Sequence, residues 1–381
     1  MEKIYVDHNA SSPCSSKHYK EVFTILEKID GNPSSTHYYG RQAKSGLEKS
    51  RFYLADYLQV DTKQVFFTSG ATESNNIVVQ SLCSHNQEVQ NVLLSKTEHP
   101  SISVPLKKLE KQQKLKLLYF PVDSRGLYKK EELLDLVQKY SSCIRAVFLL
   151  YVNNETGVVN DVKFLTDCIK RINSSIHVHV DAVQALAKCE LSWLRDSLLD
   201  SASFSSHKIG GFKGVGALYL KNPDAEKYVF LQGGSQELGH RAGTENLPGI
   251  ISFGLKLKDL KQEGLWSQKT LEVKQYIVER ICGLPPLVIH GDQGLTSCNT
   301  ISFHIKGRDV QELLLRFELA GVAVSSGSAC SSGLVEPSQV LIAMGFNEEE
   351  AGSSIRISLS PTNTIEEAEK IVNLIQQLCS V

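Results

Sequence analysis

The segment FFTSGATESNN, residues 66–76, places small and hydroxyl-bearing residues where an apolar run ends and a helical pattern begins. At such a junction backbone N–H groups can approach a phosphate, and the positive end of the helix dipole favours an anion. The segment fits neither G-x-x-x-x-G-K-[ST] nor G-x-G-x-x-G, which argues against a nucleotide site. Phosphate binding is one interpretation, and an ordinary Ser/Thr helix cap with Glu73 in the first turn is the other.

The segment HVHVDAVQALAK, residues 177–188, carries two imidazoles and one carboxylate on a predicted strand. Side chains alternate across a strand, so His177, His179 and Asp181 share one face. These three could bind a metal, but no further ligand follows at a recognised spacing. A carboxylate at the end of a strand could instead hold a protonated ring nitrogen, or cap a helix that follows.

The segment SFSSHKIGGFKGVGALYL, residues 203–220, places Lys208 in a glycine-rich turn between two apolar runs. A lysine confined in this way can lose its proton and form a Schiff base, whereas an exposed loop lysine is the simpler alternative. The three segments together are more specific than each alone. A phosphate cradle, an acid and a lysine form the constellation of a pyridoxal-phosphate enzyme, in which the acid protonates the ring nitrogen and the lysine holds the cofactor.

The segment VSSGSACSSG, residues 324–333, surrounds Cys330 with serine and glycine. Such flanks contribute little to a packed core, which argues against a buried structural thiol. A thiol that attacks a substrate needs thiolate character and access to it. Serine and glycine on both sides would supply mobility. The pattern predicts a mobile, reactive cysteine.

Short apolar runs alternate with helical patterns through most of the chain, which indicates a mainly parallel sheet covered by helices on both faces. The predicted strands are Val65–Thr68, Val92–Leu94, Leu117–Phe120, Ala146–Val152, Val178–Asp181, Ala202–Ser205 and Gly216–Leu220. Helices are predicted at Thr72–Cys83 and Lys129–Tyr140.

After about residue 260 the pattern changes, and it predicts a smaller α+β domain whose boundary falls inside a helix near Ile250–Lys261. Its expected strands and helices are Leu287–His290, Thr300–Ile305, Ile355–Leu359, Val310–Glu318 and Ile365–Leu378. We therefore expect an α/β fold with a large domain at 14–258 and a small domain formed by 1–13 and 259–381.

The charge balance excludes several classes of protein. There are 41 basic and 42 acidic residues, a net charge of −1, so no basic surplus argues for nucleic acid. The longest apolar run, Ala146–Val152, is far shorter than the ~20 residues of a membrane helix. The first residues show no signal or transit pattern, which predicts a cytoplasmic protein. Nine cysteines without a C-x-x-C pair indicate reduced thiols rather than a disulfide framework or a zinc knuckle.

The order of motifs along nearly the whole chain resembles the cysteine desulfurases of the NifS/IscS type. These belong to the class V aminotransferase family of fold-type I pyridoxal-phosphate enzymes. The motifs are DHNASSP, GNPSSTHYYGR, TSGATESNN, TEHPS, NNETG, HVDAVQALAK, SFSSHKIGG, GHRAGTEN, SSGSACSSG and SSIRISLS. The resemblance implies the fold-type I architecture, with a seven-stranded sheet in the large domain.

The resemblance also implies a role for each matching residue. Lys208 would hold pyridoxal 5'-phosphate, Asp181 would pair with its ring nitrogen, and Gln184 would contact its phenolic oxygen. His99 would stack on the ring as a candidate acid or base. The phosphate would be held by Ala71, Thr72, Ser205 and His207, and by Thr244 reaching from the other subunit of a homodimer.

For the reaction, the resemblance implies conversion of L-cysteine to L-alanine with sulfur transfer to Cys330 as a persulfide. Arg356 would bind the substrate carboxylate, assisted by Asn154. A sulfur-acceptor protein, such as an iron–sulfur scaffold or a tRNA-modification relay, would then receive the sulfur. Two alternatives stay open on the same fold, namely a selenocysteine lyase and a catalytically silent sulfur carrier or assembly partner.

Overall fold

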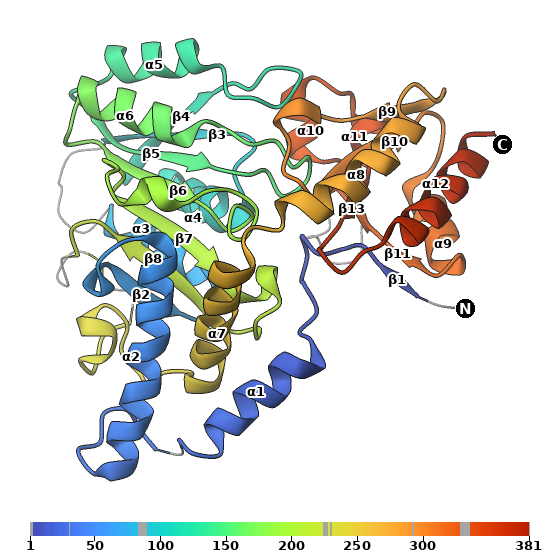
Figure 1. Ribbon diagram of the computed structural model, residues 1–381. Helices are drawn as coiled ribbons and strands as arrows, with labels where there is room; N and C mark the ends of the chain where they lie inside the picture. The colour runs from blue at the N-terminus through green and yellow to red at the C-terminus, as the bar shows by residue number, and fades with distance from the viewer. Residues whose placement is uncertain are drawn as a thin grey trace.

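A computed structural model describes residues 3–29, 31–82, 90–223, 228, 231–291, 293–327 and 336–380. Its larger unit is built around a seven-stranded sheet with the strand order β2-β8-β7-β6-β5-β3-β4 (Figure 1). The strands of this sheet are β2 Val65–Thr68, β3 Gln90–Ser95, β4 Leu115–Phe120, β5 Ile144–Leu150, β6 His177–Asp181, β7 Ser201–Ser205 and β8 Gly216–Leu220.

The sheet is mainly parallel, because only β8 runs against its two neighbours, β7 and β2. All seven strands expected from the sequence are present, so the predicted α/β class is confirmed. Several boundaries differ by one or two residues, and at its C-terminal end β5 stops at Leu150 rather than at Val152. Val152 instead pairs with Val159 across the tight loop that contains Asn154, which turns the chain back before the next helix.

Side chains of successive strand residues enter two different cores, because a strand directs them alternately to opposite faces. Phe67 and Val147 pack into the core shared with helices α2, α5, α6 and α7. Phe66 and Phe148 pack into the core shared with helices α3 and α4 on the other face. The helices of this unit are α1 Ser16–Leu26, α2 Tyr38–Leu58, α3 Ala71–Ser81, α4 Pro100–Lys111, α5 Lys130–Lys139, α6 Val162–Ile172 and α7 Leu247–Glu263.

The smaller unit consists of an antiparallel sheet, ordered β12-β13-β10-β9, and the helices packed on it (Figure 1). Strand β1, near the N-terminus, pairs with β11, so the chain begins beside its own C-terminal part. The elements are β1 Ile4–Tyr5, β9 Leu287–Ile289, β10 Thr300–Ile305, β11 Val322–Ala323, β12 Ser325–Ser326, β13 Ile355–Ser358, α8 Ser267–Ile281, α9 Val310–Leu319, α10 Gln339–Met344, α11 Glu348–Gly352 and α12 Ile365–Ser380.

Helix α7 runs through the predicted boundary near residue 258 without a break, and the exact division at 14–258 stays a prediction. One alternative left open by the sequence is not supported by the structure. Residues 183–188 form turns rather than a helix, so Asp181 caps no helix there. Among the described residues, no helix has the length and apolar character needed to cross a bilayer.

Candidate active site

A cavity of about 590 Å³ opens where several parallel strands of the large sheet end, against the segment that follows β1. Ligands of open α/β sheets bind at the carboxyl ends of the strands, so this is the expected place for a site. Ten of the residues singled out in the sequence line the cavity together: Ala71, Thr72, His99, Asn154, Asp181, Gln184, Ser205, His207, Lys208 and Arg356.

Of the two other predicted residues, one lies outside this cavity and the other is not among the described residues. Thr244 lies beside a separate hollow of about 110 Å³, which shares Ser69 and Gly214 with the large cavity. Cys330 lies outside the described residues.

The N-terminus of α3 forms one end of the cavity. Its N-cap residue, Gly70, makes no side-chain cap, so the first backbone N–H groups of the helix have no such acceptor. Glu73 does not cap them, because its carboxylate accepts from Ser69 N at 2.9 Å and pairs with Arg241 at 3.0 Å. Helix termini with free N–H groups bind anions, and the same cavity wall carries the Ser205 hydroxyl. This arrangement favours the phosphate interpretation over the ordinary cap.

Asp181 is 3% exposed, and neighbouring hydrogen-bond donors orient its carboxyl group. Val183 N donates to Oδ1 at 3.1 Å, and Asn75 Nδ2 donates to Oδ2 at 3.1 Å. Asn75 is oriented in turn by His179, whose Nε2 lies 3.0 Å from Asn75 Oδ1. His177 and His179 each form a hydrogen bond to Ser201 Oγ at 2.8 Å. The two imidazoles therefore connect β6 to β7.

Lys208 lies in the 3₁₀ turn Ser206–Ile209 that follows β7. Its Nζ donates to the carbonyl oxygens of Asn9 at 2.7 Å and Ala10 at 3.0 Å. The segment after β1 therefore holds the amine inside the cavity. A primary amine in this position is placed to bond covalently to a carbonyl compound bound between α3 and Asp181.

His99 is the N-cap residue of α4, and its ring faces the same cavity. Nδ1 accepts from Ser101 N at 3.1 Å and lies 2.7 Å from Ser101 Oγ. With Nδ1 accepting, the neutral ring carries its proton on Nε2. Burial, the largest influence, lowers the pKa of His99, and Lys208 lowers it further while Asp181 opposes the shift. His99 is therefore a neutral imidazole that can donate from Nε2.

Arg356 lies on β13 of the smaller unit and lines the same cavity, and it is 3% exposed. Nη2 contacts Asp7 Oδ1 at 2.8 Å, and Nη1 donates to Asn154 O at 3.1 Å. Its Nε is buried and has no hydrogen-bond partner among the described residues. A buried guanidinium with an unused donor fits a ligand carboxylate.

A second cavity of about 450 Å³ adjoins the first and shares His99, Asn154 and Arg356 with it. Gly327 and Glu336, which flank the stretch containing Cys330, line this second cavity.

Two carboxyl groups, the buried Glu98 and the half-buried Glu155, also border the second cavity. Burial, reinforced by Asp181, raises the pKa of Glu98 to about 8. Burial raises the pKa of Glu155 to about 7, against the opposing hydrogen bond from Ser338 and the charge of Arg356.

Several residues that build the site were missed from the sequence. Asn9 O accepts from both Lys208 and Gln184 Nε2, the latter at 2.9 Å, and the motif DHNASSP by itself does not indicate this role. Lys188 is buried at the same place and donates to Gln184 Oε1 at 2.7 Å. Asn75, in TSGATESNN, is one helical turn after Ala71. That spacing was the available signal that its side chain faces the same way.

Comparisons with known proteins agree with the geometry. The aminotransferase class-V family matches residues 4–371. Cysteine desulfurase 2 of Trichormus variabilis is 34% identical, over 98% of this chain and 92% of the relative. A solved NifS-like protein superposes with a TM-score of 0.88 at 30% identity, covering 100% of both chains. A structure described as SspA in complex with cysteine superposes with a TM-score of 0.80 at 26% identity, covering 95% of this chain and 100% of the other.

Proposed function

The chain belongs to the class-V aminotransferase family, and from this premise we propose that it is a pyridoxal-phosphate-dependent cysteine desulfurase. The observation that carries the proposal is that Lys208, Asp181, Arg356 and the N-terminus of α3 all line one cavity. Such an enzyme requires four groups: a covalent anchor, an acid for a ring nitrogen, a group that binds a carboxylate and a group that binds an anion.

The residues of the cavity fit the cofactor. The uncapped N-terminus of α3, with Ser205 and His207, would hold its phosphate. Burial, followed by the charge of Lys208, lowers the pKa of His207 to about 4, so His207 is a neutral hydrogen-bonding group. Asp181 would hold the ring nitrogen and Lys208 the aldehyde carbon. When bound, pyridoxal phosphate supplies an electron sink that makes the α-proton of an amino acid acidic.

The chain's own groups divide the work on the substrate. Arg356, with Asn154 beside it, would orient the carboxylate of L-cysteine and so select an α-amino acid. The amine of Lys208 would take the α-proton. Because Ser101 N donates to Nδ1 of His99, the proton of the neutral ring lies on Nε2. His99 therefore fits the role of a hydrogen-bond donor better than that of a base.

Cys330 would complete the reaction. Its thiolate would attack the substrate sulfur, so that a sulfur–sulfur bond forms on Cys330 while the carbon–sulfur bond of the substrate breaks, and the β-carbon, which keeps the bonding electron pair, takes a proton to give alanine. Both flanks of its segment, Gly327 and Glu336, border the cavity next to Arg356, which supports access of this segment to the substrate. The persulfide would then pass to an acceptor protein.

The proposal extends to a homodimer in which Thr244 contacts the phosphate bound by the partner subunit. The support is its position, because Thr244 lies just outside the anion end of the cavity rather than within it. Delivery of sulfur to an iron–sulfur scaffold or to a tRNA-modification relay belongs to the same proposal.

The test measures alanine and sulfide formed from L-cysteine, together with cofactor absorbance and protein-bound persulfide. Cys330→Ser is expected to keep the absorbance and lose persulfide, whereas Lys208→Ala is expected to lose turnover. Cys282→Ser removes an exposed thiol and is the matched control, expected to behave as the unmodified protein.

Two outcomes would replace the proposal with an alternative. A much faster rate on selenocysteine than on cysteine, insensitive to Cys330→Ser, would indicate a selenocysteine lyase. Absence of cofactor absorbance and of turnover in the unmodified protein would indicate a silent sulfur carrier.

A further inference from the structure

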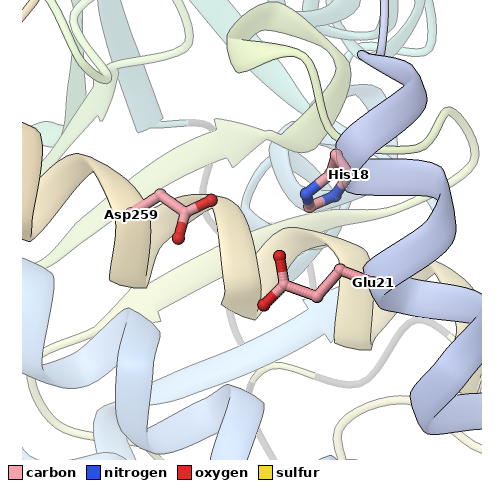
Figure 2. A group of neighbouring side chains, drawn as sticks. All are labelled: His18, Glu21 and Asp259. Carbon is pink, nitrogen blue, oxygen red and sulfur yellow. The ribbon is translucent and has the colours of Figure 1, made fainter.

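A cluster of three potential metal ligands lies between α1 and α7, outside the cavity described above. His18 and Glu21 are three residues apart on α1, so they share one face of that helix. Asp259 comes from the facing helix α7. Figure 2 shows the imidazole and the two carboxylates turned toward the same space between the helices.

The three ligand atoms are close enough for one ion. A ring nitrogen of His18 and one oxygen each of Glu21 and Asp259 lie within 4.8 Å of one another. A first-row divalent ion with bonds of about 2.1 Å holds its ligand atoms roughly 3–4 Å apart. The two carboxylates are only partly buried, so small rotations of their side chains could close the difference.

The surroundings of the His18 imidazole are a second observation, separate from the clustering, that indicates a ligand. The residue is 2% exposed, and its Nδ1 is buried without a hydrogen-bond partner among the described residues. Its Nε2 lies 2.9 Å from Ser252 Oγ, which also accepts from Phe212 N at 2.9 Å. A metal-bound histidine commonly donates its other N–H to an oxygen fixed in this way, which leaves the lone pair on the first nitrogen.

The charges favour a cation. Neither Glu21 nor Asp259 forms an ion pair in the part of the chain that the structure describes, although their oxygens are close to each other. Two adjacent carboxylates repel, and a divalent ion between them would cancel that repulsion.

We propose that His18, Glu21 and Asp259 form a structural site for a first-row divalent cation. One imidazole nitrogen and two carboxylate oxygens suit Mn²⁺, Fe²⁺ or Zn²⁺. The bound ion would tie α1 to α7. Because α1 directly follows the segment whose carbonyl groups hold Lys208, the site would stabilise this segment without contacting the substrate.

The probe is Mn²⁺, titrated into the full-length purified protein and followed by electron paramagnetic resonance. Mn²⁺ prefers oxygen and imidazole ligands, so the free cysteines compete little for it. We expect one saturable site per chain. His18→Ala and Asp259→Asn should each weaken binding at least ~10-fold, while Glu263→Gln, an exposed carboxylate on the same helix as Asp259, should leave it unchanged.

Thermal unfolding is a second measurement, needed in case the His18→Ala protein folds poorly. It relies on Asp259→Asn, which alters only a partly exposed side chain. Mn²⁺ at about 100 times its dissociation constant should raise the Tm of the unmodified and Glu263→Gln proteins by a few degrees, and that of Asp259→Asn far less. Absence of Mn²⁺ binding by the unmodified protein at about 1 mM would overturn the proposal, as would equal binding by Asp259→Asn.

Discussion

Glu98 offers the clearest test of how burial controls charge beside the cavity. Its Oε1 accepts from Tyr128 OH at 3.1 Å, and its Oε2 is buried without a hydrogen-bond partner among the described residues. Burial and the neighbouring Asp181 raise its pKa from 4.5 to about 8. The folded protein therefore keeps a proton on Glu98 over a pH range in which the unfolded chain has lost it.

This difference makes stability fall as pH rises. Between about pH 4.5 and 8 the folded state binds the extra proton, so the free energy of unfolding decreases by up to about 1.4 kcal/mol per pH unit. Glu98→Gln replaces the protonated acid by a neutral amide of the same shape and removes this contribution. Over two pH units the variant should gain up to about 3 kcal/mol relative to the unmodified protein.

Urea unfolding of both proteins at about pH 5.5, 6.5 and 7.5 measures the difference directly. Glu131→Gln, an exposed carboxylate in the first turn of α5, is the control and should show no such trend. If the stability difference between Glu98→Gln and the unmodified protein stays constant across this range, or shrinks as pH rises, the reasoning is wrong.

Two further substitutions test buried polar contacts. Glu237→Ala removes the carboxylate that accepts from Arg51 Nη1 at 2.7 Å and Nη2 at 2.8 Å, and leaves that guanidinium buried. We expect urea unfolding to show a loss of about 3–5 kcal/mol, and a loss below about 1 kcal/mol would contradict the assignment. Lys188→Met removes the donor that orients Gln184, so pyridoxal phosphate, titrated by fluorescence, should bind roughly 10-fold more weakly; unchanged affinity would show that Lys188 plays no such part.

Most strands of the large sheet could be predicted because they are buried on both faces, the exception being the edge strand β4 with Lys116 and Tyr119 exposed. Each expected strand lies within two residues of the observed one, as with Val65–Thr68 and Gly216–Leu220, which coincide. Buried strands of a parallel sheet appear in the sequence as short apolar runs bounded by turn residues. The end of β5 was harder to predict, because Val152 is apolar but pairs within a loop.

The candidate site could be predicted in its residue types but not in its internal contacts. Lys208, Asp181 and Arg356 stand in recognisable motifs, and all three line one cavity. The motifs do not reveal that Asp7 contacts Arg356 or that Asn9 accepts from Lys208. Those contacts join residues hundreds of positions apart, so only the packing of β1 against the smaller unit produces them.

By itself, the sequence determined the order of the elements, the class of the fold and the side chains available for chemistry, because apolar periodicity and motif composition are local properties. Only the tertiary structure determined the protonation of these side chains and the contacts that they make. It set the proton of His99 on Nε2, raised the pKa of Glu98 to about 8 through burial, and brought α1 against α7 around His18. Protonation and ligand geometry depend on desolvation and on neighbours distant in the chain, and both arise only when the chain is folded.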